Sequence, residues 1–262
     1  MDQKIQMNEF KLNSANLQNG IYFLSQPKDN FESVYLKVRE KENRIYTDDE
    51  LANLPFASAQ NPHKEEWKLR AKSYLRFANY LKLKKDTLNI LDIGCGNGWF
   101  CGRLSKSFKH NFYCLDVNLT EMIQGIRVFN QEQIKFIYAD IFTVNFTLEA
   151  FDLITINAAI QYFPDLKKLL NRLLILLAND GEIHVMDSPV YSEAEAIKAK
   201  QRTQNYYSSL GFPEMKEKYF HHTWNNFRGF NSKVLYNPLL PANRLKRIFR
   251  KDSSFPWIRV TN

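Results

Sequence analysis

Cysteine is scarce in this chain of 262 residues, and long apolar runs are missing. The three cysteines, Cys95, Cys101 and Cys114, are odd in number and show no Cys-x-x-Cys spacing, so neither a disulfide framework nor a metal site is expected. No stretch approaches the roughly 18 consecutive apolar residues of a membrane span. The first six residues also lack the charged start and apolar run of a secretory signal. We therefore expect a cytoplasmic protein without membrane association.

Internal repeats and low-complexity tracts are also absent, which excludes solenoid and disordered classes. Hydrophobic residues make up 44% of the chain, enough for one sizeable core at this length. We expect an N-terminal extension over residues 1–60 and a main domain over residues 61–262, with a helical lid inserted at about residues 190–228. The oligomeric state is expected to be monomer or homodimer.

The net charge of +8 comes largely from two basic runs, Lys64–Lys85 and Arg244–Lys251. Such runs most often form solvated helix faces. An anionic substrate or a nucleic-acid surface is the alternative. No known nucleic-acid-binding module is recognisable in the sequence, so nucleic acid is not the expected partner.

Strand and helix patterns alternate through the main domain, which predicts a parallel sheet in an α/β fold. A capping box at Thr47–Glu50 begins a helix that must end by Pro55, and another at Ser192–Glu195 begins a helix to about Leu210. Further helices are expected after Asn61-Pro62 and over residues 97–108, 119–130 and 165–178. Strands are expected at residues 35–39, 88–93, 111–117, 134–138, 151–157, 183–186, 233–236 and 257–260.

The most informative segment is a glycine-rich turn between a predicted strand and a predicted helix. It reads Asp92-Ile93-Gly94-Cys95-Gly96-Asn97-Gly98. Glycine permits positive φ and lets a ligand lie directly against the backbone, while the helix start offers free amides. A carboxylate near the turn disfavours a pyrophosphate and favours a ligand that carries an ammonium and a sulfonium. Asp92 therefore points to S-adenosylmethionine rather than a nicotinamide dinucleotide.

Acids also follow the next two predicted strands. Asp116 lies 18 residues beyond Gly98, where a carboxylate can accept hydrogen bonds from both hydroxyls of a ribose. Asp140 follows the strand after that, where it can accept from an adenine amino group while Ile141 packs against the ring. Each acid alone fits a helix cap or loop, but the three in this order favour one adenosyl ligand.

These motifs resemble the class I S-adenosylmethionine-dependent methyltransferase superfamily, in particular its small-molecule branch with the methyltransferase type 11 pattern, over about residues 64–190. The resemblance implies a doubly wound, seven-stranded, mostly parallel Rossmann-like sheet whose last two strands form a reversed hairpin. It implies that the chain transfers a methyl group to a small-molecule acceptor and releases S-adenosylhomocysteine. The implied cofactor-binding residues are Asp92, Gly94, Cys95, Gly96, Asn97, Gly98, Asp116, Val117, Asp140, Ile141 and Asn157.

The catalytic and acceptor-binding residues are less constrained. Related sequences often carry His where this chain has Gln161, and Gln cannot act as a general base. The candidate catalytic residues are His221, His222 and Asp187, although a structural role fits each of them. The candidate substrate residues are Trp67, Arg70, Tyr162 and Tyr191. For Trp67, core packing is the alternative.

Three other functions remain open on the sequence alone. A nicotinamide-dependent oxidoreductase would use a similar glycine turn, although Asp92 disfavours it. A module that binds the cofactor without catalysis would keep the same pocket. A nucleic-acid methyltransferase would suit the basic runs, but the Asn/Asp-Pro-Pro-Tyr/Phe element of base amino methylation is missing, because the fourth strand of the resemblance ends Asn157-Ala158-Ala159-Ile160.

Overall fold

The strands form one mixed sheet in a computed structural model that describes residues 12–13, 16–26, 29–84, 86–243 and 251–262. Their order is β1-β2-β5-β4-β3-β6-β7-β9-β8. The strands are β1 (Leu17–Gln18), β2 (Ile21–Phe23), β3 (Asn89–Ile93), β4 (Asn111–Asp116), β5 (Ile134–Tyr138), β6 (Phe151–Asn157), β7 (Leu177–Met186), β8 (Asn231–Tyr236) and β9 (Trp257–Thr261).

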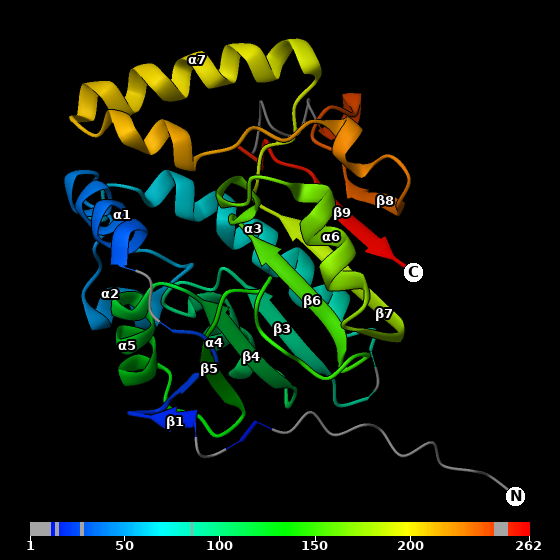
Figure 1. Cartoon of the computed structure of the whole chain (residues 1–262). Coiled ribbons are helices and arrows are strands. Elements are labelled where there is room, and N and C mark those ends of the chain that lie inside the picture. Colours follow the sequence, from blue (N-terminus) through cyan, green and yellow to red (C-terminus); the bar gives the residue numbers. More distant parts are fainter. Residues whose placement is uncertain (1–11, 14–15, 27–28, 85, 244–250) are drawn as a thin grey trace, which may run out of the picture.

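Helices surround this sheet, and α7 lies across the top of the molecule (Figure 1). The α-helices are α1 (Asp29–Lys41), α2 (Asp48–Asn53), α3 (Lys64–Leu81), α4 (Trp99–Ser105), α5 (Leu119–Val128), α6 (Leu166–Leu174) and α7 (Glu193–Leu210). Three short 3₁₀ helices are η2 (Ile160–Tyr162), η3 (Pro213–Lys218) and η4 (Trp224–Phe227). The segment between β7 and β8 thus contains α7, η3 and η4; that this segment acts as a lid stays a prediction.

Strands β3 to β7 pair in parallel, whereas β9 runs antiparallel between β7 and β8. This confirms an α/β fold with a mostly parallel sheet. The expected count of seven strands is wrong, because the described residues form nine. The N-terminal strand β2 pairs in parallel with β5, and β1 pairs with β2. This pairing satisfies backbone groups of β5 that would otherwise be exposed at a sheet edge.

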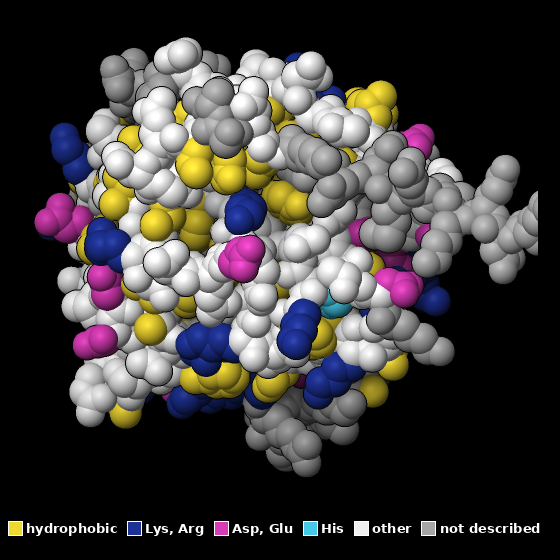
Figure 2. Space-filling model, turned by 90° about the horizontal axis from the view of Figure 1, so that it is seen from below, with side chains coloured by type: hydrophobic (Ala, Val, Ile, Leu, Met, Phe, Trp, Pro, Cys, Tyr) yellow, Lys and Arg dark blue, Asp and Glu magenta, His cyan; other side chains and the backbone are white. Residues whose placement is uncertain are grey.

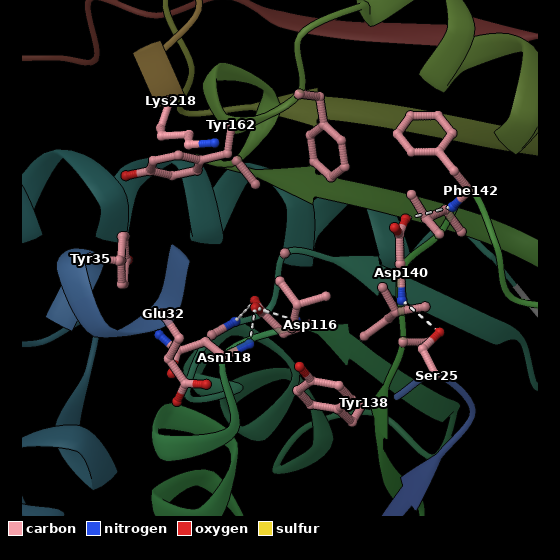
Figure 3. A pocket seen from close by; sticks show the side chains of 18 of the residues that line it. Ser25, Glu32, Tyr35, Asp116, Asn118, Tyr138, Asp140, Phe142, Tyr162 and Lys218 are labelled. Atoms are coloured by element: carbon pink, nitrogen blue, oxygen red, sulfur yellow. Dashed lines mark hydrogen bonds between the residues drawn. The ribbon is translucent and has the colours of Figure 1, made fainter. Parts of the chain in front are cut away.

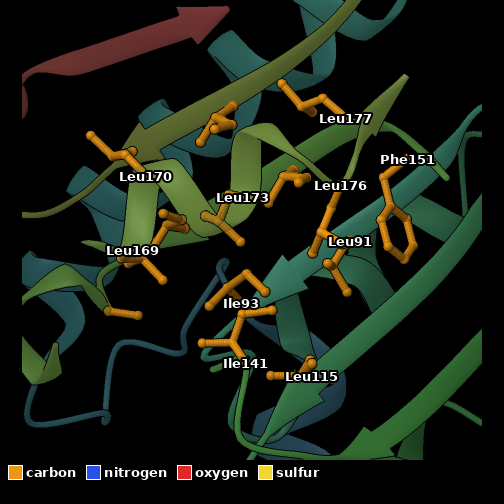
Figure 4. Packing of buried hydrophobic residues seen from close by; sticks show 14 of the residues in the cluster. Leu91, Ile93, Leu115, Ile141, Phe151, Leu169, Leu170, Leu173, Leu176 and Leu177 are labelled. Atoms are coloured by element: carbon orange, nitrogen blue, oxygen red, sulfur yellow. The ribbon is translucent and has the colours of Figure 1, made fainter. Parts of the chain in front are cut away.

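Side chains alternate between two apolar layers, one on each face of the sheet. Leu91 and Ile93 of β3 pack with the inward leucines of α6 (Figure 4). Ile90 of the same strand packs on the other face, with residues of α3, α4 and α5. Successive side chains of a strand point to opposite faces of the sheet, and here both faces are buried, which produces this division. The sheet is thereby fixed between two layers, and only its ends remain available for a site.

The expected helix boundaries are correct where a capping signal defines them. Both capping boxes form, at Thr47 with Glu50 and at Ser192 with Glu195. Helix α7 ends at Gly211, whose φ of 87° is the left-handed conformation that glycine adopts without strain.

Two expected elements are wrong. Residues 35–39 form part of α1 and not a strand, because Arg39 lies over the ring of Tyr35 one turn earlier, 5.7 Å from its centroid, and Val38 packs against α7 and η3. The sixth helix ends at Leu174, and the chain enters the sheet at Leu177, which pairs with Phe151. Residues 179–181 belong to β7 and lie at its register shift, between Leu177, which pairs with Phe151, and Glu182, which pairs with Leu153.

Basic side chains are mixed with acidic ones over the surface. Figure 2 shows Lys and Arg spread over one face with Asp and Glu between them. On α3, Lys68 pairs with Glu65 at 2.6 Å and Arg70 with Glu66 at 2.9 Å. These pairs agree with a solvated helix face for the first basic run, while residues 244–250 of the second lie outside the described residues. Among the helices that the structure describes, none has the length and apolar character to cross a membrane.

Candidate functional site

The glycine turn follows β3 and leads into α4. Gly94, Gly96 and Gly98 have φ values of 69°, 55° and 70°, which L-residues with a Cβ adopt only with strain. Space is also lacking, because a Cβ on Gly94 would lie 2.6 Å from the Cβ of Ala159 and one on Gly96 would lie 2.7 Å from Oε2 of Glu121. The turn thus needs glycine for both conformation and close approach.

Asp116 holds this turn from the end of the neighbouring strand. Its Oδ2 accepts a hydrogen bond from the Gly96 amide at 2.7 Å, and its Oδ1 accepts from Val117 and Asn118 at 2.7 and 2.9 Å. Burial raises the pKa of Asp116, against these amide hydrogen bonds, which favour the carboxylate. The carboxylate is therefore fixed at the mouth of the turn.

Asp140 lies one strand further along the same edge. Its Oδ1 accepts from the Phe142 amide at 3.0 Å, and its own amide donates to Ser25 Oγ at 3.1 Å. Ser25 belongs to the N-terminal segment, so residues far apart in the sequence meet here. Figure 3 shows Asp116 near the centre of the cavity and Asp140 with Ser25 on one side of it.

A cavity of about 440 Å³ lies over these strand ends, within the usual range of small-molecule sites. Its walls come from the strand ends, the N-terminal segment, the loop after β6 and the inserted segment. The principal lining residues are Ser25, Glu32, Tyr35, Gly94, Gly96, Asp116, Val117, Asn118, Glu121, Tyr138, Asp140, Ile141, Phe142, Ala158, Tyr162, Phe163, Lys218 and Phe220.

A family model described as a methyltransferase domain matches residues 84–249, more than half of the chain. The chain belongs to this methyltransferase family. This membership places it in the class I S-adenosylmethionine-dependent superfamily, as the sequence resemblance indicated.

Curated relatives agree with this membership. An uncharacterized methyltransferase of Mycobacterium bovis is 28% identical over 97 residues, which are 37% of this chain and 49% of the relative. The malonyl-[acyl-carrier protein] O-methyltransferase of Acetivibrio thermocellus is 29% identical over 124 residues, or 44% of this chain and 43% of the relative. The chain thus matches about half the length of these relatives.

Solved structures share the fold. A Galdieria sulphuraria protein described as a candidate sarcosine dimethylglycine methyltransferase aligns with a TM-score of 0.57 at 12% identity, covering 87% of this chain and 97% of that one. The YcgJ protein of Bacillus subtilis aligns with a TM-score of 0.55 at 14% identity, covering 73% of this chain and 99% of that one. At these identities the likeness concerns the fold alone.

The methyltransferase cavity includes six of the eleven predicted cofactor residues, namely Gly94, Gly96, Asp116, Val117, Asp140 and Ile141. Asp92 does not line it. The Asp92 carboxylate is buried in the sheet and accepts a hydrogen bond from Thr155 Oγ1 at 2.6 Å, and burial raises its pKa to about 7. This buried position suits a structural role, in which Asp92 supports the glycine turn from below.

The remaining four predicted cofactor residues do not line the cavity. They are Cys95, Asn97, Gly98 and Asn157. Asn157 ends β6 beside Ala158, and its Oδ1 is buried without a hydrogen-bond partner among the described residues. The cofactor-binding role of these four residues stays a prediction.

None of the predicted catalytic residues lines the cavity. His222 Nε2 lies 2.8 Å from the Ile160 carbonyl oxygen, and His221 Nε2 lies 2.8 Å from Thr203 Oγ1. Asp187 accepts from Ser73 Oγ at 2.6 Å, and burial raises its pKa to about 6. The two histidines thus lie in the segment between β7 and β8, directly after the cavity residue Phe220. Their catalytic role stays a prediction.

Of the predicted substrate residues, Tyr162 alone lines the cavity. Trp67 is buried and donates from Nε1 to the Tyr46 hydroxyl at 3.0 Å. Arg70 stacks on Trp67, 5.1 Å from its ring. Tyr191 lies beside the ring of His221, with centroids 5.8 Å apart. The last three therefore lie outside the cavity lining.

Sequence reasoning missed Glu121, which lines the cavity at its glycine end, and Arg39, which interacts with Glu121 without lining the cavity. Glu121, in the first turn of α5, reaches Gly96, and burial raises its pKa to about 7, with Arg39 opposing and Asp116 and Glu32 adding to the effect. Arg39 of α1 has a buried Nε without a hydrogen-bond partner among the described residues. Only the burial of an acid at a helix start distinguishes Glu121 from an ordinary cap, and the sequence does not show that.

Proposed function

We propose that this chain is an S-adenosylmethionine-dependent methyltransferase that acts on a small-molecule acceptor. The observation that carries the proposal is Asp116, which is hydrogen-bonded to the glycine turn at one side of a cavity lined by aromatic side chains at the other. Family membership supports methyl transfer, and the aromatic side chains that line the cavity support a small acceptor beside the cofactor.

The adenosine half of the cofactor fits the residues at the ends of β4 and β5. Asp116 lines the cavity, and because three backbone amides occupy three of the roughly four acceptor sites of its carboxylate, one site remains to accept from a ribose hydroxyl. Asp140 can accept from the adenine amino group, and Ile141 offers an apolar surface to the ring. This is the arrangement expected from the strand-end acids.

The amino-acid half of the cofactor fits Glu121, Arg39 and Asn157. The carboxylate of Glu121 and the amide oxygen of Asn157 suit the ammonium group of the cofactor, and the guanidinium of Arg39 suits its carboxylate. The unpartnered Arg39 Nε and Asn157 Oδ1 are costly to bury unless a ligand satisfies them. These two orphaned atoms therefore support a polar ligand at this end.

The bound cofactor supplies a methyl group on a positively charged sulfur, which is already reactive toward nucleophiles. The residues of this chain then need mainly to orient the acceptor and exclude water. Tyr162, Phe163 and Phe220 cover the cavity opposite the strand ends and serve the exclusion of water.

Cofactor affinity is expected to fall as the pH drops below about 7, because Glu121 would then be protonated and could not pair with the cofactor ammonium. The loss approaches about tenfold per pH unit. For Glu121→Gln, calorimetry should give a weaker affinity that is nearly independent of pH between about 6 and 8. This range lies within about one unit of the pKa of Glu121.

The exposed cavity residue Glu217 provides the matched control, since Glu217→Gln should keep the wild-type pH profile. Asp92, whose pKa is also near 7, remains in both proteins, so the difference reports Glu121. A Glu121→Gln profile identical to wild type would contradict the assignment.

The experiment that tests the proposed function has two stages. Calorimetry with S-adenosylhomocysteine and with reduced nicotinamide dinucleotide separates a methyltransferase from an oxidoreductase, and we expect only the first ligand to bind. Incubation with methyl-labelled cofactor and a metabolite extract should then label a small molecule. Tight cofactor binding with no labelled product would favour the non-catalytic binding module, and tight dinucleotide binding would overturn both.

A further inference from the structure

An aromatic wall closes the side of the cavity opposite Asp140. Tyr162 and Phe220 line it, and Tyr162 makes edge contacts with Tyr35 and Tyr219 at centroid distances of 5.7 and 6.0 Å. Edge-to-face pairs of this kind hold rings in fixed orientations. The wall thus offers a preformed apolar surface to the body of an acceptor.

The inserted segment is fastened to this wall by backbone hydrogen bonds. The Phe220 amide donates to the Gln161 carbonyl at 2.7 Å, and His222 contacts the Ile160 carbonyl. Lys218 ends η3 two residues before Phe220, so its position relative to the wall is set by the same contacts. Figure 3 shows Lys218 on the same side of the cavity as Tyr162.

Lys218 is the single cationic side chain among the described residues that line the cavity. Of the five described acids that line the cavity with it, Glu32, Asp116 and Asp140 accept hydrogen bonds from other groups, Glu121 lies at the glycine end, and Glu217 is exposed beside Lys218. Glu32 accepts from the amide and hydroxyl of Thr120, both at 2.8 Å, and Asp116 accepts from three amides. Within the described part of the chain, Lys218 itself forms no ion pair.

From this arrangement we infer that Lys218 recognises an anionic group of the acceptor, a carboxylate or a phosphate, while the aromatic wall holds its apolar body. The inference rests on the proposed function and adds the class of acceptor to it. Lys218 is exposed, so its ammonium gives an anion a modest attraction, which the adjoining apolar wall strengthens by excluding water from one side. The cofactor brings its own carboxylate, but Arg39 lies at that end of the cavity, near Glu121.

The test uses protein saturated with S-adenosylhomocysteine and small aromatic probes of different charge. Calorimetry with 3-phenylpropionate tests a carboxylate, and calorimetry with phenyl phosphate tests a phosphate. The neutral amide of 3-phenylpropionate gives the uncharged comparison of the same shape as the carboxylate probe. We expect at least one anion to bind about fivefold or more tighter than the amide. In Lys218→Gln that preference should disappear, and in Lys218→Glu the cationic probe 3-phenylpropylamine should become the tighter ligand.

Lys216→Gln is the matched control, because Lys216 lies on the same short helix without lining the cavity, and it should behave as wild type. Equal binding of acid and amide to the wild type, or no binding of either anion, would overturn the inference. A loss of S-adenosylhomocysteine affinity in Lys218→Gln would also overturn it, since the lysine would then serve the cofactor. Failure of the wild type to bind S-adenosylhomocysteine would instead overturn the proposed function.

Discussion

Replacing Asp116 with alanine is expected to weaken S-adenosylhomocysteine binding by a factor of about 10 or more, since a hydrogen bond to a charged group contributes about 1.5–3 kcal/mol. The substitution also removes the acceptor that holds the Gly96, Val117 and Asn118 amides. The turn should therefore loosen, which adds to the loss. Calorimetry at fixed pH measures the affinity.

Two variants separate a specific loss from a general one. Asp116→Asn keeps one acceptor oxygen, and its affinity should lie between those of wild type and Asp116→Ala. Asp165→Ala removes an acid that caps α6 by accepting from the Lys168 amide at 2.9 Å but does not line the cavity. That control should lose about 1 kcal/mol of stability at most and keep its affinity. Unchanged affinity in Asp116→Ala, with the melting temperature of a folded protein, would refute the ribose assignment.

Strand register explains why two of the three predicted acids line the cavity and the third does not. Asp92 pairs with Cys114, and Asp116 pairs with Tyr138. Asp92 therefore lies two residues deeper in the sheet than Asp116, whereas Asp140 lies two residues beyond the end of β5. Proximity to the glycine turn in sequence made Asp92 look like a ligand, but register decides which carboxylates reach the edge.

The central sheet was predictable because its strands are short apolar runs separated by helical patterns, which depend on local sequence. The rest of the cavity depends on contacts between distant segments. Ser25 meets Asp140 across 115 residues, and Glu32 meets Thr120 across 88. Periodicity carries no information on such pairs, so the contributions of α1 and β2 could not be foreseen. Tyr35 could not be foreseen as a cavity residue either, because apolar and polar residues alternate over residues 35–39 as they do in a strand.

Gly98→Ala is expected to destabilise the fold by about 2–5 kcal/mol, the sum of about 1–2 for a left-handed residue with a Cβ and about 1–3 for overpacking. Gly98 has a φ of 70°, and a Cβ there would lie 2.7 Å from Cε1 and Cζ of Phe136. The Phe136 ring cannot retreat, because a Cβ on Gly125 would meet the same two atoms at 2.7 Å. The ring is thus held between two glycines, so the backbone must shift.

Gly211→Ala isolates the conformational part of this cost. Gly211 also has a positive φ, 87°, but a Cβ there would meet nothing within 4 Å, so only about 1–2 kcal/mol should be lost. Urea unfolding of both variants gives the packing part as their difference. Combining Gly98→Ala with Phe136→Leu should cost less than the sum of the single changes, because the smaller side chain leaves room for the methyl group. Strict additivity, or equal losses in Gly98→Ala and Gly211→Ala, would show that backbone strain alone requires glycine at position 98.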